Sequence, residues 1–183
     1  MIAPLVAIVL LASPEAMPRT FSVVPGNSTL TYHLTHRFHG VTGVSRTLEG
    51  KARILPDGDV QVMVRAPLAS FDSGERNRDA NMRDATGAAH DPFVVFKGVG
   101  HLVTPAAYPS DVRVVLRGEL TLKTARPIEV EVALHFDSAD HASARAKFPI
   151  SLEDHKVERP SLLLIKVDDH VVIDAELELA SDR

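Results

Sequence analysis

The sequence contains no cysteine and no tryptophan, and only seven phenylalanines and two tyrosines among its 183 residues. Without cysteine, the chain cannot hold disulfides, zinc–thiolate sites, iron–sulfur clusters, a thiol nucleophile or a cysteine-linked lipid anchor. Valine, leucine and isoleucine recur throughout, and these residues suit β-strands better than an aromatic-rich binding surface. The fold must therefore be held by packing alone, and the length favours one domain.

An excess of positive charge is also missing. Lysine and arginine number 20 against 24 aspartates and glutamates, which gives a formal net charge of -4. A protein that binds DNA or RNA through the phosphate backbone needs a cationic surface. We therefore expect no nucleic-acid partner.

Only one long apolar run is present, at residues 2–12 (IAPLVAIVLLA). It is too short to cross the roughly 30 Å hydrocarbon core of a membrane as a helix, but it has the length of a signal-peptide core. We predict a signal peptide over 1–16, a mature domain over 17–183, and a periplasmic or secreted protein without a stable membrane span. No lysine or arginine precedes the run and the cleavage site is poor, so a mis-assigned start or a short core strand are the alternatives.

From residue 20 onward, apolar and polar residues alternate in short runs separated by turn residues. For example, Leu30, Tyr32, Leu34, His36 and Phe38 fall on one face of a predicted strand over 29–38. Further strands are predicted over 48–55, 60–68, 94–102, 112–122, 128–136, 142–152, 162–167 and 171–179. This pattern predicts an all-β fold and is typical of an antiparallel barrel or sandwich. Because closure removes exposed strand edges, we expect a barrel of roughly eight strands, whose interior is filled by side chains or holds one ligand.

One polar segment breaks the alternation. Residues 72–91 (DSGERNRDANMRDATGAAHD) contain few β-branched residues and are rich in helix formers between 75 and 89. We predict a loop that carries a short helix.

Several stretches carry a family resemblance that covers most of residues 20–179. Residues 21–30 look like the first hairpin of the YceI-like family, and His36, Gly43 and 48–50 follow as in its histidine–glycine run. The most specific stretches are 70–74 with 78–83, followed by 92–96. Asn81 stands where the family usually carries histidine, residues 123–127 lack the usual turn glycine, and the usual arginine and Phe-Gly near the end are not apparent. The chain therefore resembles a divergent branch of these periplasmic or secreted lipocalin-like proteins.

The resemblance implies that the barrel interior takes the chain of an isoprenoid lipid, of polyprenyl or isoprenoid-quinone type, with the helix-bearing loop near its mouth and no cofactor. A homodimer is an open possibility. The candidate ligand-binding residues are His36, Phe38, Val62, Val64, Ala66, Phe71, Arg78, Asp79, Asn81, Met82, Phe93, Phe96 and Phe148.

Each of these residues also has a structural interpretation. Arg78 can bond two oxygens of a head group, or it can join Asp79 in tying the loop to the barrel. His36, on an apolar face, fits a hydrogen-bonded core histidine as well as a ligand contact. The phenylalanines can line a tunnel or fill a closed core.

Metal binding and catalysis find little support. His33 and His39 share a face of the predicted strand but lie roughly 20 Å apart along it, while His36 points the other way. No nucleophile elbow, phosphate loop or carboxylate pair outside a turn is present. We therefore expect no metal site and no enzyme, but a non-enzymatic protein that binds, transports or stores an isoprenoid lipid. The alternative is a closed-core β module that binds a protein partner in the cell envelope, and the volume of the interior discriminates between the two.

Overall fold

The computed structural model describes residues 17–182 except 37–38, 160, 163–164 and 167. The predicted signal segment 1–16 and Phe38 lie outside the described residues. In chain order the elements are β1 (Arg19–Val23), β2 (Thr29–His36), β3 (His39–Ser45), β4 (Glu49–Ile54), β5 (Asp59–Pro67), the 3₁₀ turn η1 (Leu68–Ser70), α1 (Arg76–Thr86), β6 (Phe93–His101), β7 (Ser110–Leu122), β8 (Thr124–Phe136), β9 (His141–Ser151), β10 (Ser161–Leu162), β11 (Ile165–Lys166) and β12 (His170–Ser181).

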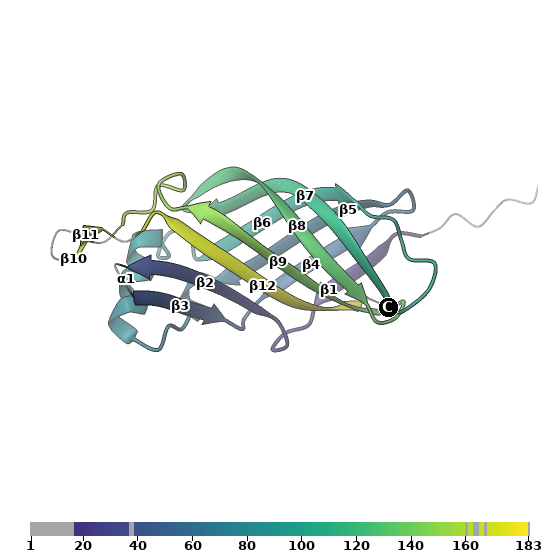
Figure 1. Ribbon diagram of the computed structural model, residues 1–183, viewed down its shortest axis with the longest axis horizontal. Helices are drawn as coiled ribbons and strands as arrows, with labels where there is room; N and C mark the ends of the chain where they lie inside the picture. The colour runs from purple at the N-terminus through teal and green to yellow at the C-terminus, as the bar shows by residue number, and fades with distance from the viewer. Residues whose placement is uncertain (1–16, 37–38, 160, 163–164, 167, 183) are drawn as a thin grey trace, which may run out of the picture.

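The main sheet is a closed antiparallel barrel, which confirms the predicted fold class. Its strand order is β1-β4-β5-β6-β7-β8-β9-β12-β2-β3, and the pairing of β1 with β12 closes the ring. Figure 1 shows an elongated barrel in which long strands such as β7, β8 and β12 run obliquely along the long axis. Closure leaves these strands no exposed edge to pair with another chain.

Two successive strands share one neighbour. β12 pairs with β2 through Val171–Glu176 and with β1 through Leu179–Ser181, so β1 and β2 run in the same direction along it. The expectation of a first hairpin over 21–30 was therefore wrong. The turn at 24–28 joins two strands that run in the same direction, so it does not reverse the chain. In the same way β3, which pairs with β2, precedes β4, which pairs with β1.

Two predicted strands have other boundaries. β2 ends at His36, whose backbone pairs with His39 of the antiparallel β3, so the predicted strand over 29–38 was too long and the separation inferred between His33 and His39 does not hold. The predicted strand over 162–167 is replaced by the short antiparallel pair β10–β11. In the first case apolar and polar residues go on alternating past the end of β2, and in the second the sequence is a run of mostly apolar residues, so neither pattern marks where the strand ends.

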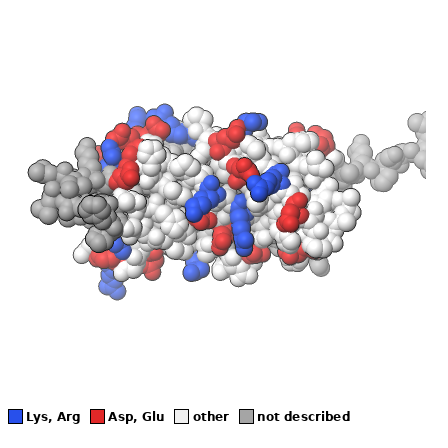
Figure 2. Space-filling model, viewed as in Figure 1, with Lys and Arg blue, Asp and Glu red and all other residues white. Residues whose placement is uncertain are grey.

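Alternation places aliphatic side chains inside the barrel and charges outside. In β7, Val114, Leu116 and Leu120 are buried, while Val115, Arg117 and Glu119 between them are exposed. On the outside, Arg113 and Arg117 pair with glutamates of β8. Figure 2 shows acidic and basic side chains interspersed over the visible face, so no cationic field forms there.

The helix α1 lies at one end of the barrel, the same end as β10 and β11 (Figure 1). It falls within the predicted region and has well-formed caps. The carboxylate of Glu75 accepts hydrogen bonds from the N–H groups of Asn77 and Arg78 at 3.0 and 2.7 Å, and Gly87 ends the helix at φ 72°. Among the described residues, no helix is long and apolar enough to cross a membrane.

Candidate functional site

The barrel is hollow. It encloses a cavity of about 550 Å³ that is lined mainly by aliphatic and aromatic side chains from the strands and from α1. The interior thus offers the volume that distinguishes a ligand-binding barrel from a closed core.

One end of the cavity is sealed by aromatic packing. Phe21, Leu102 and Phe136 line the cavity there, and each is only 2% exposed. The rings of Phe21 and Phe136 meet edge to face, with centroids 6.1 Å apart and planes at 72°. These residues form the floor of the cavity.

The opposite end, at α1, is the mouth. Glu75 and Asn81 of the helix region and Glu158 of the loop after β9 line the cavity and are exposed, so the cavity meets solvent there. Met82 and Ala85 line it beside Asn81. Residues 78, 81, 82 and 85 recur at the spacing of one helix face, which explains why they line the cavity together.

A compact polar cluster lies beside the mouth, where α1 begins. Its centre is Ser73, whose hydroxyl donates to Asp79 and accepts from Nε of Arg78 at 2.8 Å. Nη2 of Arg78 also donates to the carbonyl of Ser73 at 2.6 Å. Asp79 is 8% exposed and does not line the cavity, whereas Arg78 does. Arg78 therefore holds the loop through Ser73 and also borders the cavity.

Tyr32 brings a phenol into this cluster from β2. Burial first, and then the negative charge of Asp79, raise the pKa of Tyr32, and this outweighs the opposing effects of a hydrogen bond with Ser73 and of the Arg78 charge. The phenol is therefore protonated at neutral pH and can donate a hydrogen bond. Its ring packs 5.7 Å from that of Phe71 and lies against Gly43 of β3, the residue opposite in the sheet.

Most of the residues predicted to bind a ligand lie around the cavity. Those that line it are Val62, Val64, Ala66, Phe71, Arg78, Asn81, Met82, Phe96 and Phe148. Phe93 is not among them, and its ring centroid lies 4.6 Å from the guanidinium carbon of Arg65. The side chain of His36 and the whole of Phe38 fall outside the described part of the chain.

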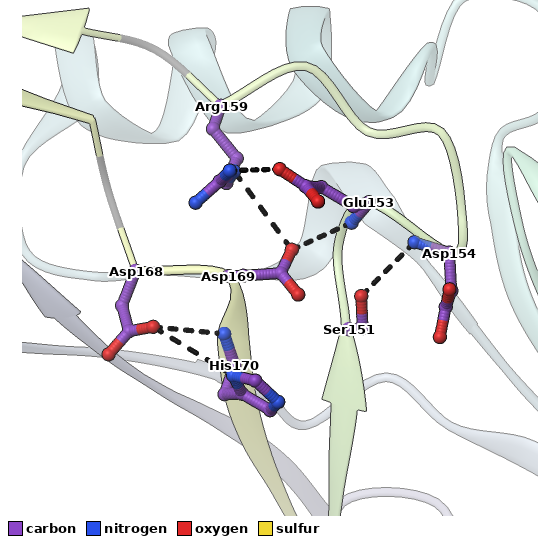
Figure 3. A network of polar contacts seen from close by, with 7 residues as sticks. All are labelled: Ser151, Glu153, Asp154, Arg159, Asp168, Asp169 and His170. Carbon is purple, nitrogen blue, oxygen red and sulfur yellow. Dashed lines mark hydrogen bonds and ion pairs between the residues drawn. The ribbon is translucent and has the colours of Figure 1, made fainter.

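A second polar network anchors the loop after β9, close to the mouth (Figure 3). Arg159 pairs with Glu153 and lies 3.9 Å from Asp169 at the start of β12. Asp169 in turn accepts a hydrogen bond from the Glu153 N–H at 2.8 Å. Burial acts to raise the pKa of Asp169, but hydrogen bonds from Ser151 and the Glu153 N–H and the nearby charges of Arg159 and His170 together hold this pKa below its ordinary value. The carboxylate thus helps to fix the loop that carries Glu158.

The part of the chain that the structure describes contains no cluster of side chains suited to bind a metal ion. No group of three or more histidine, cysteine, aspartate or glutamate side chains is arranged there to hold a metal ion. The chemistry that the cavity does offer is apolar contact along its length and hydrogen bonding near its mouth.

A model of the YceI-like domain matches residues 21–179, which include most or all of every barrel strand. The chain belongs to the YceI-like family. No curated protein sequence matches it.

Solved structures show the same fold. A polyisoprenoid-binding domain from Saccharophagus degradans, implicated in plant cell wall breakdown, is 16% identical, with a TM-score of 0.69 over 88% of this chain and 98% of that one. BcnA from Burkholderia cenocepacia is 20% identical, with a TM-score of 0.67 over 85% and 98%. A YceI protein from Campylobacter jejuni is 16% identical, with a TM-score of 0.61 over 81% and 89%. This YceI-like chain therefore shares the barrel with relatives whose sequences have diverged widely.

Several residues of this YceI-like site escaped the sequence reasoning. Tyr32 was assigned to the apolar face of its strand but not to the site, although it shares the parity of Leu30 and Leu34, which line the cavity. Ser73 falls within the family-like stretch 70–74, but that stretch does not show what its hydroxyl contacts. Glu158 reaches the mouth because the contact of Arg159 with Asp169 holds the loop after β9 near the start of β12.

Proposed function

We propose that this YceI-like protein binds one isoprenoid lipid, with the apolar chain inside the barrel and the head group at the mouth. The observation that carries the proposal is an apolar cavity that is closed at one end and bordered by hydrogen-bonding groups at the other. A long, flexible, apolar molecule with one polar end matches this arrangement.

The energy for binding comes from the lining. Removal of apolar surface from water contributes roughly 25 cal/mol per Å², so an aliphatic tunnel binds a long chain without specific polar contacts. The ends of the cavity then orient the lipid. The phenol of Tyr32 and the guanidinium of Arg78, which border the cavity beside Ser73, are the groups that meet the head group.

The likeness to a polyisoprenoid-binding domain from Saccharophagus degradans supports the choice of ligand class. We further propose a role without catalysis, as a carrier or reservoir, in the periplasm or outside the cell. The apolar run at residues 2–12, read as the core of a signal peptide over 1–16, supports that location.

The proposal is tested by blocking the tunnel. Ala66 is fully buried and lines the cavity, so Ala66→Phe places a ring where the chain would lie. Delipidated wild-type and variant proteins are titrated with a long-chain polyprenol in detergent micelles, and bound polyprenol is measured after gel filtration. We expect the wild type to retain about one equivalent and Ala66→Phe to retain at least tenfold less.

Ala133→Phe is the matched control, because Ala133 lies on the exposed face of β8. Circular dichroism checks that both variants fold. Equal retention by Ala66→Phe and Ala133→Phe would refute binding within the barrel.

A further inference from the structure

We infer that the aromatic floor of the cavity sets the length of the isoprenoid chain that the protein accepts. The inference rests on the proposed function and adds a selectivity to it. Phe21 and Phe136 are the residues to which we assign this selectivity.

The floor lies across the end of the cavity as a continuous apolar layer. Phe136, at the end of β8, pairs with Ala142 of β9, and Phe21 lies beside it on β1. Tyr108 backs this pair from the loop after β6, with its ring centroid 6.4 Å from that of Phe136. A chain that enters from α1 meets the two phenylalanine rings at the bottom of the tunnel.

Contacts behind the rings hold the floor in place. The guanidinium carbon of Arg19 lies 5.2 Å from the Phe21 ring centroid. The same guanidinium donates hydrogen bonds to the Tyr108 hydroxyl, at 3.4 Å, and to the carbonyl of Ala139. The loop that carries Tyr108 is tied down at its start, where the N–H of Leu102 donates to the carbonyl of Gly58 at 2.8 Å. These contacts join β1 to the loops after β6 and β8, and the loop after β6 to the turn between β4 and β5, so the layer behind the rings is packed and resists their displacement.

Because the floor is fixed, the depth of the cavity determines which isoprenoid chain length is preferred. A chain that reaches the floor buries its whole length, whereas any further isoprene unit must stay in water at the mouth, where it gains nothing from the lining. A shorter chain leaves part of the lining without contacts. The longest chain that fits within the tunnel is therefore preferred.

The test changes the depth of the tunnel in both directions. Phe136→Ala removes a ring from the floor, and Phe136→Leu is the milder change should the alanine variant fail to fold. Ala142→Leu adds bulk beside the same ring, since Ala142 is 1% exposed and lines the cavity. Phe93→Leu is the matched control, because Phe93 does not line the cavity.

Each delipidated protein is incubated with a mixture of linear polyprenols that differ by single isoprene units, and the bound fraction is analysed by mass spectrometry. We expect the mean bound length to rise by at least one unit in the Phe136 variants and to fall by at least one unit in Ala142→Leu, with Phe93→Leu unchanged. Binding with the same length distribution in all proteins would overturn the chain-length assignment and leave the proposed function standing. Absence of polyprenol from the wild type would overturn both.

Discussion

At the scale of single residues, the contacts of Ser73 decide how the loop before α1 is held. Its N–H and hydroxyl both donate to Asp79, and Arg78 closes the cluster from the other side. Removing one partner from such a buried group leaves the others unsatisfied, at a cost of about 1–3 kcal/mol. We therefore predict that Asp79→Ala lowers the free energy of unfolding by that amount, measured by urea denaturation.

Asp84→Ala is the control for this change, because Asp84 lies on the same helix and is exposed. It is expected to alter stability by less than about 0.5 kcal/mol. A stability loss no larger in Asp79→Ala than in Asp84→Ala would refute the stabilising role of the polar cluster around Ser73.

The ring of Tyr32 leaves no room for a side chain at Gly43. A Cβ at this position would lie 2.3 Å from Cε1 of Tyr32, so Gly43→Ala must push the phenol away from Ser73 and Asp79. Gly40→Ala on the same strand is the control, since nothing lies within 4 Å of the Cβ that it would add. We predict that only Gly43→Ala destabilises the fold, by about 1–3 kcal/mol in urea denaturation.

The pKa of Tyr32, followed by ultraviolet absorbance during alkaline titration, provides a second readout. In Gly43→Ala it should fall towards the ordinary value for tyrosine, because the ring loses burial and the influence of Asp79. An unchanged tyrosine titration and equal stability of the two variants would contradict this account of the ring.

Single residues also show where sequence reasoning works. Successive residues of a strand face opposite sides, so Val62, Val64 and Ala66 were correctly expected to share one face. The same rule separates Phe93 from Phe96, because residues three apart on one strand cannot both point inward, yet both were assigned to the tunnel. Ser73 and Glu158 could not be found this way, since both lie in loops, whose conformations the alternation of a strand does not describe.

At the scale of elements, the strands were predictable because each has one face toward the barrel interior and one face toward solvent. The helix was predictable from composition, and α1 ends at a glycine as helices commonly do. The sequence did not show that β1 and β2 both pair with β12, one after the other along it, or that β4 and β3 pair in turn with β1 and β2. The first arrangement depends on β12, a segment more than 130 residues away in the sequence. The second follows from the first, because β4 pairs with β1 and β3 with β2.

Loop anchoring at the mouth gives a prediction at this scale. The pKa of Asp169 is lowered, so the folded state favours its charged form. The resulting stabilisation is fully present above the ordinary aspartate pKa of about 4 and is lost as pH falls through the lower pKa of the folded state. Asp169→Asn should therefore be less stable than the wild type at neutral pH, and the difference should shrink below about pH 4.

Urea denaturation of both proteins across this pH range checks the prediction. Asp168→Asn is the matched control, because Asp168 is exposed and its carboxylate accepts a local hydrogen bond from the N–H of His170, at 3.2 Å. A stability difference between Asp169→Asn and the wild type that stays constant with pH would contradict the assignment.

At the scale of the whole molecule, the closed antiparallel barrel followed from the alternation pattern, but its content did not. Whether a barrel of about eight strands is filled or hollow depends on how side chains from all strands meet. Small residues such as Ala142 and Ala144 beside large ones such as Phe136 and Phe148 shape the tunnel, and their depths become known only once the register is fixed.

The central claim is that this tunnel holds an isoprenoid lipid, and the most direct test is mass spectrometry of the organic extract from the purified protein. The full chain is produced in bacteria and purified without detergent, with Ala66→Phe purified in parallel. We predict about one equivalent of a single class of isoprenoid lipid in the wild type and little in the variant. Folded wild-type protein that yields no isoprenoid lipid would contradict the account.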